Sequence, residues 1–242
     1  MVWKKVAVLS LAALFVATLG FAADSRQNRA ENTLMISATP FGLHPATLLG
    51  LIGGIPTVGG SFYLNENIQI GGDFAAYSGT QEDGDTKGTV SYSSIGGYSR
   101  IYWGSNSFNT LLSLHSRSWS GTATANTTTQ VTDPGSGITT DANLVADVTI
   151  DSNALVGTLG IGNQWVMDWG LVIGLDYLVL SLPLSETSSA TVDATGTVAG
   201  VTETLSGQEK ADAEAAASDL GKVLNVISYF PGLFILTMGL SF

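Results

Sequence analysis

The sequence predicts an all-β protein: a closed, eight-stranded antiparallel transmembrane up-and-down β-barrel with one helix in its last long loop. Three features support this fold class. The chain begins with an export signal, its period-two segments are joined by short and long connections in alternation, and it ends on a strand with one apolar face. A closed barrel satisfies every backbone hydrogen bond internally, which is the condition for crossing a lipid bilayer.

The first 22 residues have the pattern of a secretory signal peptide. Lys4 and Lys5 precede an apolar run over 6–21, and small residues precede the polar segment that starts at Asp24. An uncleaved anchor is the alternative, but the run is shorter than the ~20 residues that a spanning helix needs. We therefore predict cleavage after Ala22. Residues 1–22 are the signal peptide and 23–242 are the outer-membrane β-barrel.

The composition excludes several classes of protein. The chain has no cysteine, so it has neither disulfides nor thiolate chemistry. Its formal net charge is −11, and removal of the two signal-peptide lysines makes it −13. Nucleic-acid binding needs a basic surface, so we predict no nucleic-acid partner. A mature chain of this length is compatible with one all-β domain.

Period-two segments bounded by turn residues predict eight strands. Their ranges are 33–43, 55–64, 68–79, 89–103, 108–121, 148–164, 169–183 and 230–242. The connections alternate between tight turns and long loops. The tight turns are 65–67, 104–107 and 165–168, and the long loops are 44–54, 80–88, 122–147 and 184–229. All long loops therefore emerge at one end of the predicted barrel and all tight turns at the other.

This pattern resembles the small eight-stranded outer-membrane barrels of the OmpA and OmpW type, over essentially the whole mature chain. The resemblance implies export through the Sec pathway to the bacterial outer membrane, with long loops extracellular and tight turns periplasmic. It also implies contact with outer-membrane lipid and lipopolysaccharide, assembly by the barrel-assembly machinery, and a monomer.

Aromatic residues gather near the tight turns of the predicted barrel. Such side chains settle at the headgroup level of a membrane and form a girdle. The predicted interface aromatics are Tyr63, Tyr102, Trp103, Phe108, Trp165 and Trp169.

Charged residues inside the strands predict a polar lumen. Charges that face lipid cost a few kcal/mol each at mid-depth, so these side chains are expected inside. The predicted lumen charge network comprises Asp73, Arg100, His115, Arg117 and Asp176. We expect Arg–Asp pairing, because an unpaired buried charge is far less stable than a paired one. Eight strands leave an interior that side chains can fill, which favours a filled lumen over a polar conduit.

The long loops carry most of the charge. Three of them contain thirteen of the twenty acidic residues. In the last loop, Ser206 and Glu209 form a capping box, and a helical apolar stripe follows at Leu220, Val223, Leu224 and Ile227. We expect this helix over the barrel rim or in the outer interface, and we expect 187–205 either to loop or to extend the hairpin. Loop 44–54 is apolar and either touches lipid, lines a ligand entrance or lengthens its hairpin.

The sequence contains no recognisable catalytic site. His44 and His115 are the only histidines in the sequence. Ser116 points to the opposite face of the strand from His115. The acidic cluster at 82–85 lacks the twelve-residue calcium-loop pattern. We predict that the protein is not an enzyme, with no catalytic residues, no cofactor and no metal.

The last strand carries the expected assembly signal. Its bulky residues alternate with small or polar ones, and the chain stops on an aromatic residue. The predicted signal comprises Phe242, Leu240 and Met238. Together these features predict a structural or surface-interaction barrel with a filled lumen and acidic extracellular loops. A narrow channel for small polar or hydrophobic solutes is the alternative.

Overall fold

The computed structural model describes residues 25–43, 56–104, 107–132, 139–198, 201–229 and 232–242. The predicted cleavage site and loop 44–54 lie outside these ranges. Among the described residues, no helix has the length and hydropathy needed to cross a membrane.

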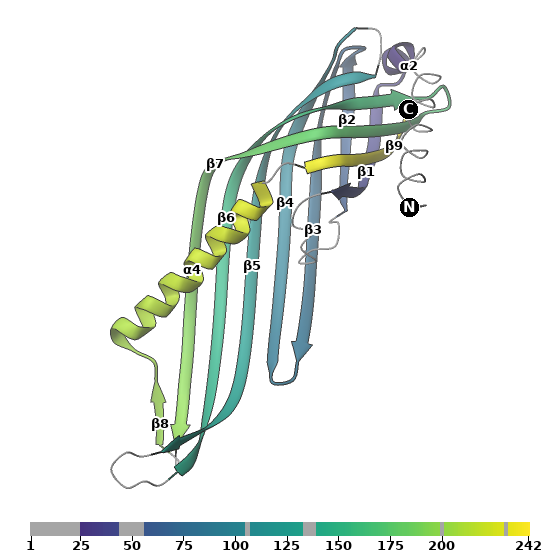
Figure 1. Ribbon diagram of the computed structural model, residues 1–242. Helices are drawn as coiled ribbons and strands as arrows, with labels where there is room; N and C mark the ends of the chain where they lie inside the picture. Colours follow the sequence, from purple (N-terminus) through teal and green to yellow (C-terminus); the bar gives the residue numbers. More distant parts are fainter. Residues whose placement is uncertain (1–24, 44–55, 105–106, 133–138, 199–200, 230–231) are drawn as a thin grey trace, which may run out of the picture.

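Eight antiparallel strands form a closed ring (Figure 1). They are β1 (Leu34–Leu43), β2 (Thr57–Asn65), β3 (Ile68–Asp83), β4 (Thr86–Tyr102), β5 (Phe108–Thr132), β6 (Thr139–Val166), β7 (Leu171–Val198) and β9 (Gly232–Ser241). Each of β1 to β7 pairs with the next, and β9 pairs with both β7 and β1. The prediction of a closed eight-stranded antiparallel barrel is confirmed.

The ends of the barrel strands that flank the three predicted tight turns lie at one end of the barrel, beside the C-terminus and the short helix α2 (Ser25–Glu31) (Figure 1). We call this end the tight-turn end. Gly104 and Gly170 occupy positive φ angles of 74° and 89° there. Only glycine adopts this backbone region without strain, which explains its position in these turns. The helix α2 is absent from the sequence-based prediction, because six polar residues and one alanine carry no apolar periodicity.

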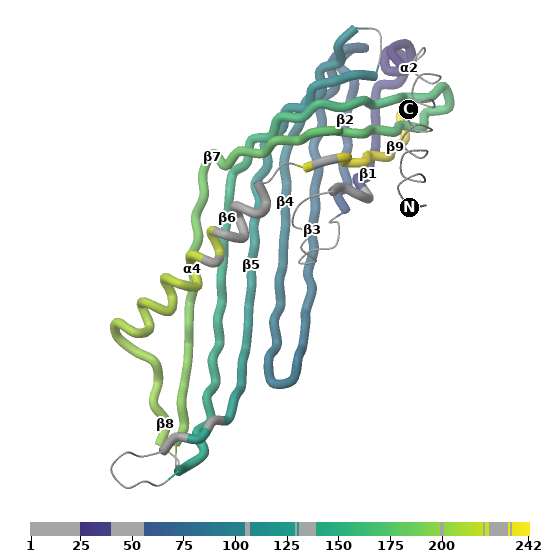
Figure 2. Tube along the Cα trace, in the orientation of Figure 1, coloured from purple at the N-terminus to yellow at the C-terminus, as the bar shows by residue number. Residues whose placement is uncertain are grey.

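Five strands continue beyond the barrel: β3 and β4 reach as far as their turn at Gly84, and β5, β6 and β7 extend farther, as the Cα trace makes clear (Figure 2). β5, β6 and β7 have 25, 28 and 28 residues, whereas β1 has 10. We call the projecting part, residues 118–132, 139–153 and 187–198, the arm. At roughly 3.3 Å per residue it extends the barrel by about 50 Å.

The prediction of loops at 122–147 and 80–88 is wrong for most of their length. Residues 122–132 and 139–147 are paired strands, and Asp83 pairs with Thr86 across a tight turn at Gly84. The predicted strands ended where large apolar residues ended. Threonine, however, is β-branched and favours strands without an apolar partner. The same reason extends β7 to Val198, where the short strand β8 (Val201–Thr204) pairs with it.

The predicted helix in the last long connection is confirmed as α4 (Gly207–Tyr229). It lies along β6 and β7 of the arm rather than across the barrel mouth (Figure 1). The Ser188 hydroxyl donates to the carbonyl of Ser218 (3.0 Å), and the Ser218 hydroxyl donates to the carbonyl of Ser188 (3.2 Å). The structure does not describe the side chains of the predicted apolar stripe.

Candidate functional site: a filled lumen and a polar arm

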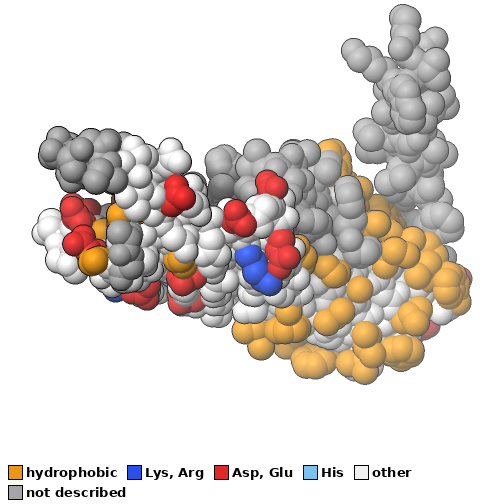
Figure 3. Space-filling view, turned by 90° about the horizontal axis from the view of Figure 1, so that it is seen from below, with side chains coloured by type: hydrophobic (Ala, Val, Ile, Leu, Met, Phe, Trp, Pro, Cys, Tyr) orange, Lys and Arg blue, Asp and Glu red, His pale blue; other side chains and the backbone are white. Residues whose placement is uncertain are grey.

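Large apolar side chains cover the outside of the barrel. They recur at alternate positions of its strands, as the period of two requires. Exposed members include Ile36, Phe62, Phe74, Ile95, Leu112, Leu114, Leu159, Ile161, Leu182, Phe234, Met238 and Leu240. The space-filling view shows them gathered on the barrel, while the arm is mostly polar (Figure 3). We call this surface the apolar belt.

The predicted interface aromatics divide into two groups. Trp103, Phe108 and Trp169 are exposed, as a girdle requires. The prediction is wrong for Tyr63, Tyr102 and Trp165, which are buried. Tyr102 lies two residues from Arg100 and therefore shares its lumen face, and Tyr63 shares the inner face of Ser61.

Trp165 is also buried, although it lies between Gln164 and Val166 of the lumen and therefore belongs to the outer face. The N–H and C=O of the neighbouring Val166 are hydrogen-bonded to Ser25 and Asn28 of α2.

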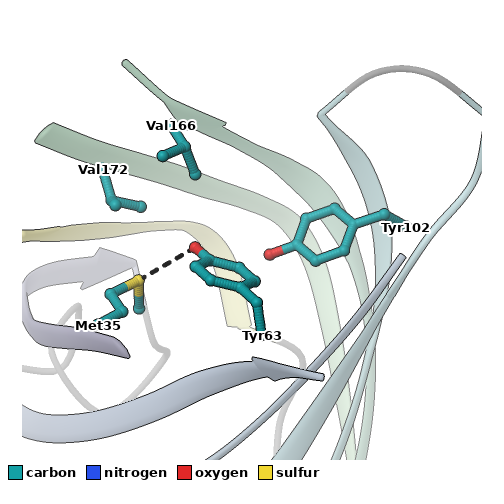
Figure 4. Close-up of a cluster of buried hydrophobic side chains, with 5 residues drawn as sticks. All are labelled: Met35, Tyr63, Tyr102, Val166 and Val172. Carbon is teal, nitrogen blue, oxygen red and sulfur yellow. Dashed lines mark hydrogen bonds between the residues drawn. The ribbon is translucent and has the colours of Figure 1, made fainter. Parts of the chain in front are cut away.

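A compact polar and apolar layer fills the lumen at the tight-turn end (Figure 4). The Tyr102 hydroxyl donates to Oε1 of Gln69 (2.7 Å) and also contacts Gln164. Gln69 Nε2 donates to Ser61 Oγ (2.7 Å). Met35 completes the layer, with Tyr63 Oη 3.5 Å from its sulfur atom. Gln69 and Gln164 are fully buried, so their hydrogen bonds offset the desolvation of two amides.

The next layer is a buried ion pair between β4 and β7. Arg100 Nη1 lies 2.6 Å from Asp176 Oδ1, and Nη2 lies 2.7 Å from Oδ2. Asn109 accepts a further hydrogen bond from Arg100 (2.8 Å). Both charged side chains are buried. A two-pronged contact of this kind is the strongest geometry available to an arginine and a carboxylate.

The remaining members of the predicted charge network lie nearer the arm. His115 Nε2 is 2.7 Å from Asp73 Oδ1, and His115 Nδ1 is 3.1 Å from Ser113 Oγ. Arg117 follows two residues later on the same face, opposite Ser94 of β4. The structure thus brings together Arg100 with Asp176 and His115 with Asp73, in two separate groups.

Ser113 is absent from the sequence-based prediction, which names Ser116. Ser116 faces outward, whereas Ser113, at position i − 2 from His115, shares the face of His115. Ser113, His115 and Asp73 form a hydroxyl–imidazole–carboxylate relay, an arrangement that can activate a nucleophile. Such catalysis also needs donors for an oxyanion and a path for substrate. No such donors are identified around Ser113 among the described residues.

Glycines on adjacent strands make room for the lumen side chains. A Cβ on Gly71 would lie 2.8 Å from Cζ of Tyr98, and a Cβ on Gly96 would overlap the ring of His115. Gly162 has the same relation to Asp176. Each pair is directly opposite in the strand register. Large polar side chains therefore lie flat over glycine, which lets a narrow barrel hold them.

The helix α2 covers the lumen at the tight-turn end. The guanidinium of Arg29 lies 3.9 Å from the centre of the Tyr102 ring, and its Nε donates to the carbonyl of Glu66 (2.9 Å). Asn28 donates to the carbonyl of Val166 (2.8 Å). Arg29 is only 1% exposed. We call α2 with these contacts the stopper.

The arm is acidic and solvent-exposed. Asp147 and Asp193 lie directly opposite each other in the β6–β7 register. Thr124 donates to Asp147 (2.7 Å), and Lys210 of α4 pairs with Asp193 (2.7 Å). At the β3–β4 turn, the hydrogen bond from Lys87 lowers the pKa of Glu82. Across the described residues, no three His, Asp or Glu side chains are grouped closely enough to hold a metal ion.

Comparisons with known proteins do not place the chain in a family. No protein-family model matches it, and no curated protein matches it. Among solved structures, the crystal structure of Acinetobacter baumannii CarO is 9% identical, over 87% of this chain and 97% of that chain, with a TM-score of 0.43. That overlap is too loose to assign a family or a function.

Proposed function

We propose that the protein is a bacterial outer-membrane barrel with a filled lumen, which presents the arm at the cell surface for structural or interaction purposes. The observation that carries this proposal is the apolar belt around a closed ring. Contiguous exposed apolar surface of this extent marks contact with lipid or protein. On a closed barrel with a polar interior, lipid is the matching environment.

The direction of insertion follows from the asymmetry of the two ends. Outer-membrane barrels have short periplasmic turns and long extracellular connections. The tight turns and the stopper therefore face the periplasm, and the arm with α4 is extracellular. Export through the Sec pathway, contact with lipopolysaccharide, assembly by the barrel-assembly machinery, a monomeric state and the OmpA- or OmpW-like relationship belong to this proposal.

Three layers argue against the alternative of a narrow channel. Arg29 of the stopper lies over Tyr102, which is hydrogen-bonded to Gln69. Arg100, opposite Gln69 in the β3–β4 register, is paired with Asp176. Side chains can fill the interior of an eight-stranded barrel. The proposal therefore assigns the interaction role to the arm.

The absence of cysteine allows a direct test of location and orientation. A single Thr128→Cys variant on the arm and a single Asn67→Cys variant at a tight turn each carry one reactive thiol. In intact cells we expect a membrane-impermeant maleimide to label Thr128→Cys alone. Labelling of Asn67→Cys alone, or of both variants equally, contradicts the proposed orientation.

Planar-bilayer recordings test the filled lumen. The purified barrel, reconstituted in lipid and shown to be folded by heat-modifiable migration, is expected to give no discrete openings. Regular openings from the folded protein support the channel alternative instead.

A further inference from the structure

We propose that the bare edge of β5 in the arm binds an extended, basic segment of a partner protein as an additional strand. This proposal rests on the proposed function, because it requires the arm to be accessible at the cell surface. Four observations on the arm support it.

The two edges of the arm differ in what covers them. Along β7, the segment beyond its pairing with β9 is covered by α4 and then by β8. The backbone N–H of Val192 even has a partner, Glu214 Oε1 (3.4 Å). Along β5, pairing with β4 ends where Thr86 lies opposite Ala125, followed by one hydrogen bond from Asn126 to Asp85. In the described part of the chain, residues 127–132 pair with β6 alone.

The direction of the free backbone groups follows from that last hydrogen bond. Asn126 N–H points away from β6, toward Asp85. Backbone groups alternate along a strand, and the β5–β6 register has no irregularity. The N–H and C=O groups of Thr128 and Gln130 therefore point to the open side, in line with the end of β4. An incoming strand would occupy the position that β4 leaves.

The edge lacks the usual protection against pairing. Proteins shield exposed edges with charged side chains, proline, bulges or covering elements. The segment from Asn126 to Thr132 has no charged residue, no proline and no register shift. It is rich in threonine, which favours strands. Addition of a strand to such an edge is a general mode of peptide recognition.

Charge decides the kind of partner. Asp83 and Asp85 are exposed at the near end of the open position, and Asp141 lies opposite Gln130 on the outward face of the arm. These carboxylates favour a strand that carries lysine or arginine. They disfavour a second copy of this chain, because its acidic arm would meet like charges. The occupant is therefore a basic extended segment of another protein.

The test measures binding of synthetic peptides to the full-length barrel in lipid nanodiscs. The probe is a ten-residue peptide of alternating lysine and threonine, labelled with a fluorophore, and binding is read by fluorescence anisotropy. We expect it to bind. A glutamate–threonine peptide and a fully N-methylated lysine–threonine peptide, which has no backbone donor, are expected to bind at least tenfold more weakly.

Matched variants separate strand addition from attraction to an acidic surface. Thr128→Pro and Gln130→Pro each remove an N–H on the open side while leaving the β6 side intact, a position at which strands tolerate proline. We expect each to weaken binding at least tenfold. Thr128→Val retains the N–H and is expected to bind like the wild type. Asp83→Asn combined with Asp141→Asn leaves the backbone unchanged and is expected to weaken binding and reduce its salt dependence.

Several results overturn the inference. Equal binding of the N-methylated peptide, or unchanged binding to both proline variants, shows surface electrostatics without strand addition. Cross-linking of two copies through Gln130→Cys shows that a second copy occupies the edge. Failure of the wild type to bind, in a barrel that migrates as folded and labels from outside, refutes the inference alone. Failure of those location controls refutes the proposed function instead.

Discussion

Arg100 and Asp176 are the residues on which the interior of the barrel most depends. Their side chains are 6% and 3% exposed, so each charge relies on the other. Removal of one partner leaves an uncompensated buried charge, which typically costs about 3–5 kcal/mol. We expect Arg100→Met to lower the free energy of unfolding by that amount, measured by urea titration in lipid vesicles.

A surface pair provides the matched control for this prediction. Arg26 is bonded to Glu66, but both side chains are substantially exposed. Exposed pairs contribute about 0–1 kcal/mol, so Arg26→Met should change the unfolding free energy by less than that. Adding Asp176→Asn to Arg100→Met should recover part of the loss. Equal effects of Arg100→Met and Arg26→Met contradict the buried role of Arg100.

The relay of Ser113, His115 and Asp73 gives a second test at this scale. We interpret its hydrogen bonds as structural, because they satisfy polar groups inside the lumen. We therefore expect no turnover of phospholipid, ester or peptide substrates by the folded barrel, and identical traces for Ser113→Ala. Hydrolysis that disappears in Ser113→Ala and persists in Ser116→Ala contradicts the prediction that the protein is not an enzyme.

Period-two alternation predicts which strand residues face the lumen when it is applied to every residue of a strand. It placed Asp73, Arg100, His115 and Asp176 inside, and the structure has them inside. Tyr102 shares the face of Arg100 and belonged with them. Which charge pairs with which depends on how β4 and β7, which are not neighbours in the sheet, face each other across the lumen, and period-two alternation does not specify this.

Among the elements, α2 depends most on one side chain. Arg29 is buried over Tyr102, and cation–π contacts contribute about 2 kcal/mol when desolvated. We expect Arg29→Ala to destabilise the docked helix by about 2 kcal/mol. The readout is faster proteolysis of the N-terminal segment in detergent. Gln27→Ala is the control, because Gln27 is exposed and its hydrogen bond to Glu31 lies within α2. Equal proteolysis of the two variants contradicts the docking role of Arg29.

Lys210 contributes an ion pair with Asp193 to the docking of α4 on the arm. The hydrogen bond to Asp193 raises the pKa of Lys210 above its ordinary value of 10.5. A raised pKa in the folded state means that this contribution is complete below the ordinary value and lost as pH rises through the folded value. A spin label on Ala215→Cys should therefore gain mobility only above about pH 10.5.

The variants for this prediction are Lys210→Gln and Lys222→Gln. Lys222 bonds to Asp219 within the helix, whereas Lys210 reaches across to β7. At neutral pH, Lys210→Gln should mobilise the label and Lys222→Gln should not. Equal mobility in both variants contradicts the role of Lys210 in docking.

The elements that sequence analysis missed share one property. The arm and α2 are polar, so they lack the apolar periodicity by which strands and helices are predicted. Residues 122–132 form a strand because each of them has a partner residue in the β5–β6 register. α4 was predictable because its start has capping chemistry and its sequence is rich in alanine.

At the scale of the whole molecule, the barrel closes where its last strand, β9, pairs with its first strand, β1. Phe242 N–H donates to the carbonyl of Leu34 (2.8 Å), and the Phe242 carbonyl accepts from Thr33 and Leu34. The C-terminal residue is thus locked to the start of β1, and its side chain is 61% exposed on the outside. Phe242 is therefore displayed at the tight-turn end without contributing to the core.

This exposure makes the assembly-signal prediction testable. We expect Phe242→Asp to impair insertion in cells strongly, read as loss of the heat-modifiable form. The backbone hydrogen bonds of Phe242 persist in this variant. A charge near the membrane interface costs only about 0–1 kcal/mol, too little to prevent folding. A strong defect therefore reflects recognition of the terminal residue by assembly machinery.

Two comparisons isolate that recognition. Phe108→Asp places the same charge on another exposed aromatic beside a tight turn, and it should insert in cells like the wild type. Purified Phe242→Asp should fold into lipid vesicles without machinery as well as the wild type does. A defect of both variants in cells, or of Phe242→Asp in vesicles, assigns the effect to membrane energetics. Normal insertion of Phe242→Asp in cells contradicts the prediction that Phe242 is part of the assembly signal.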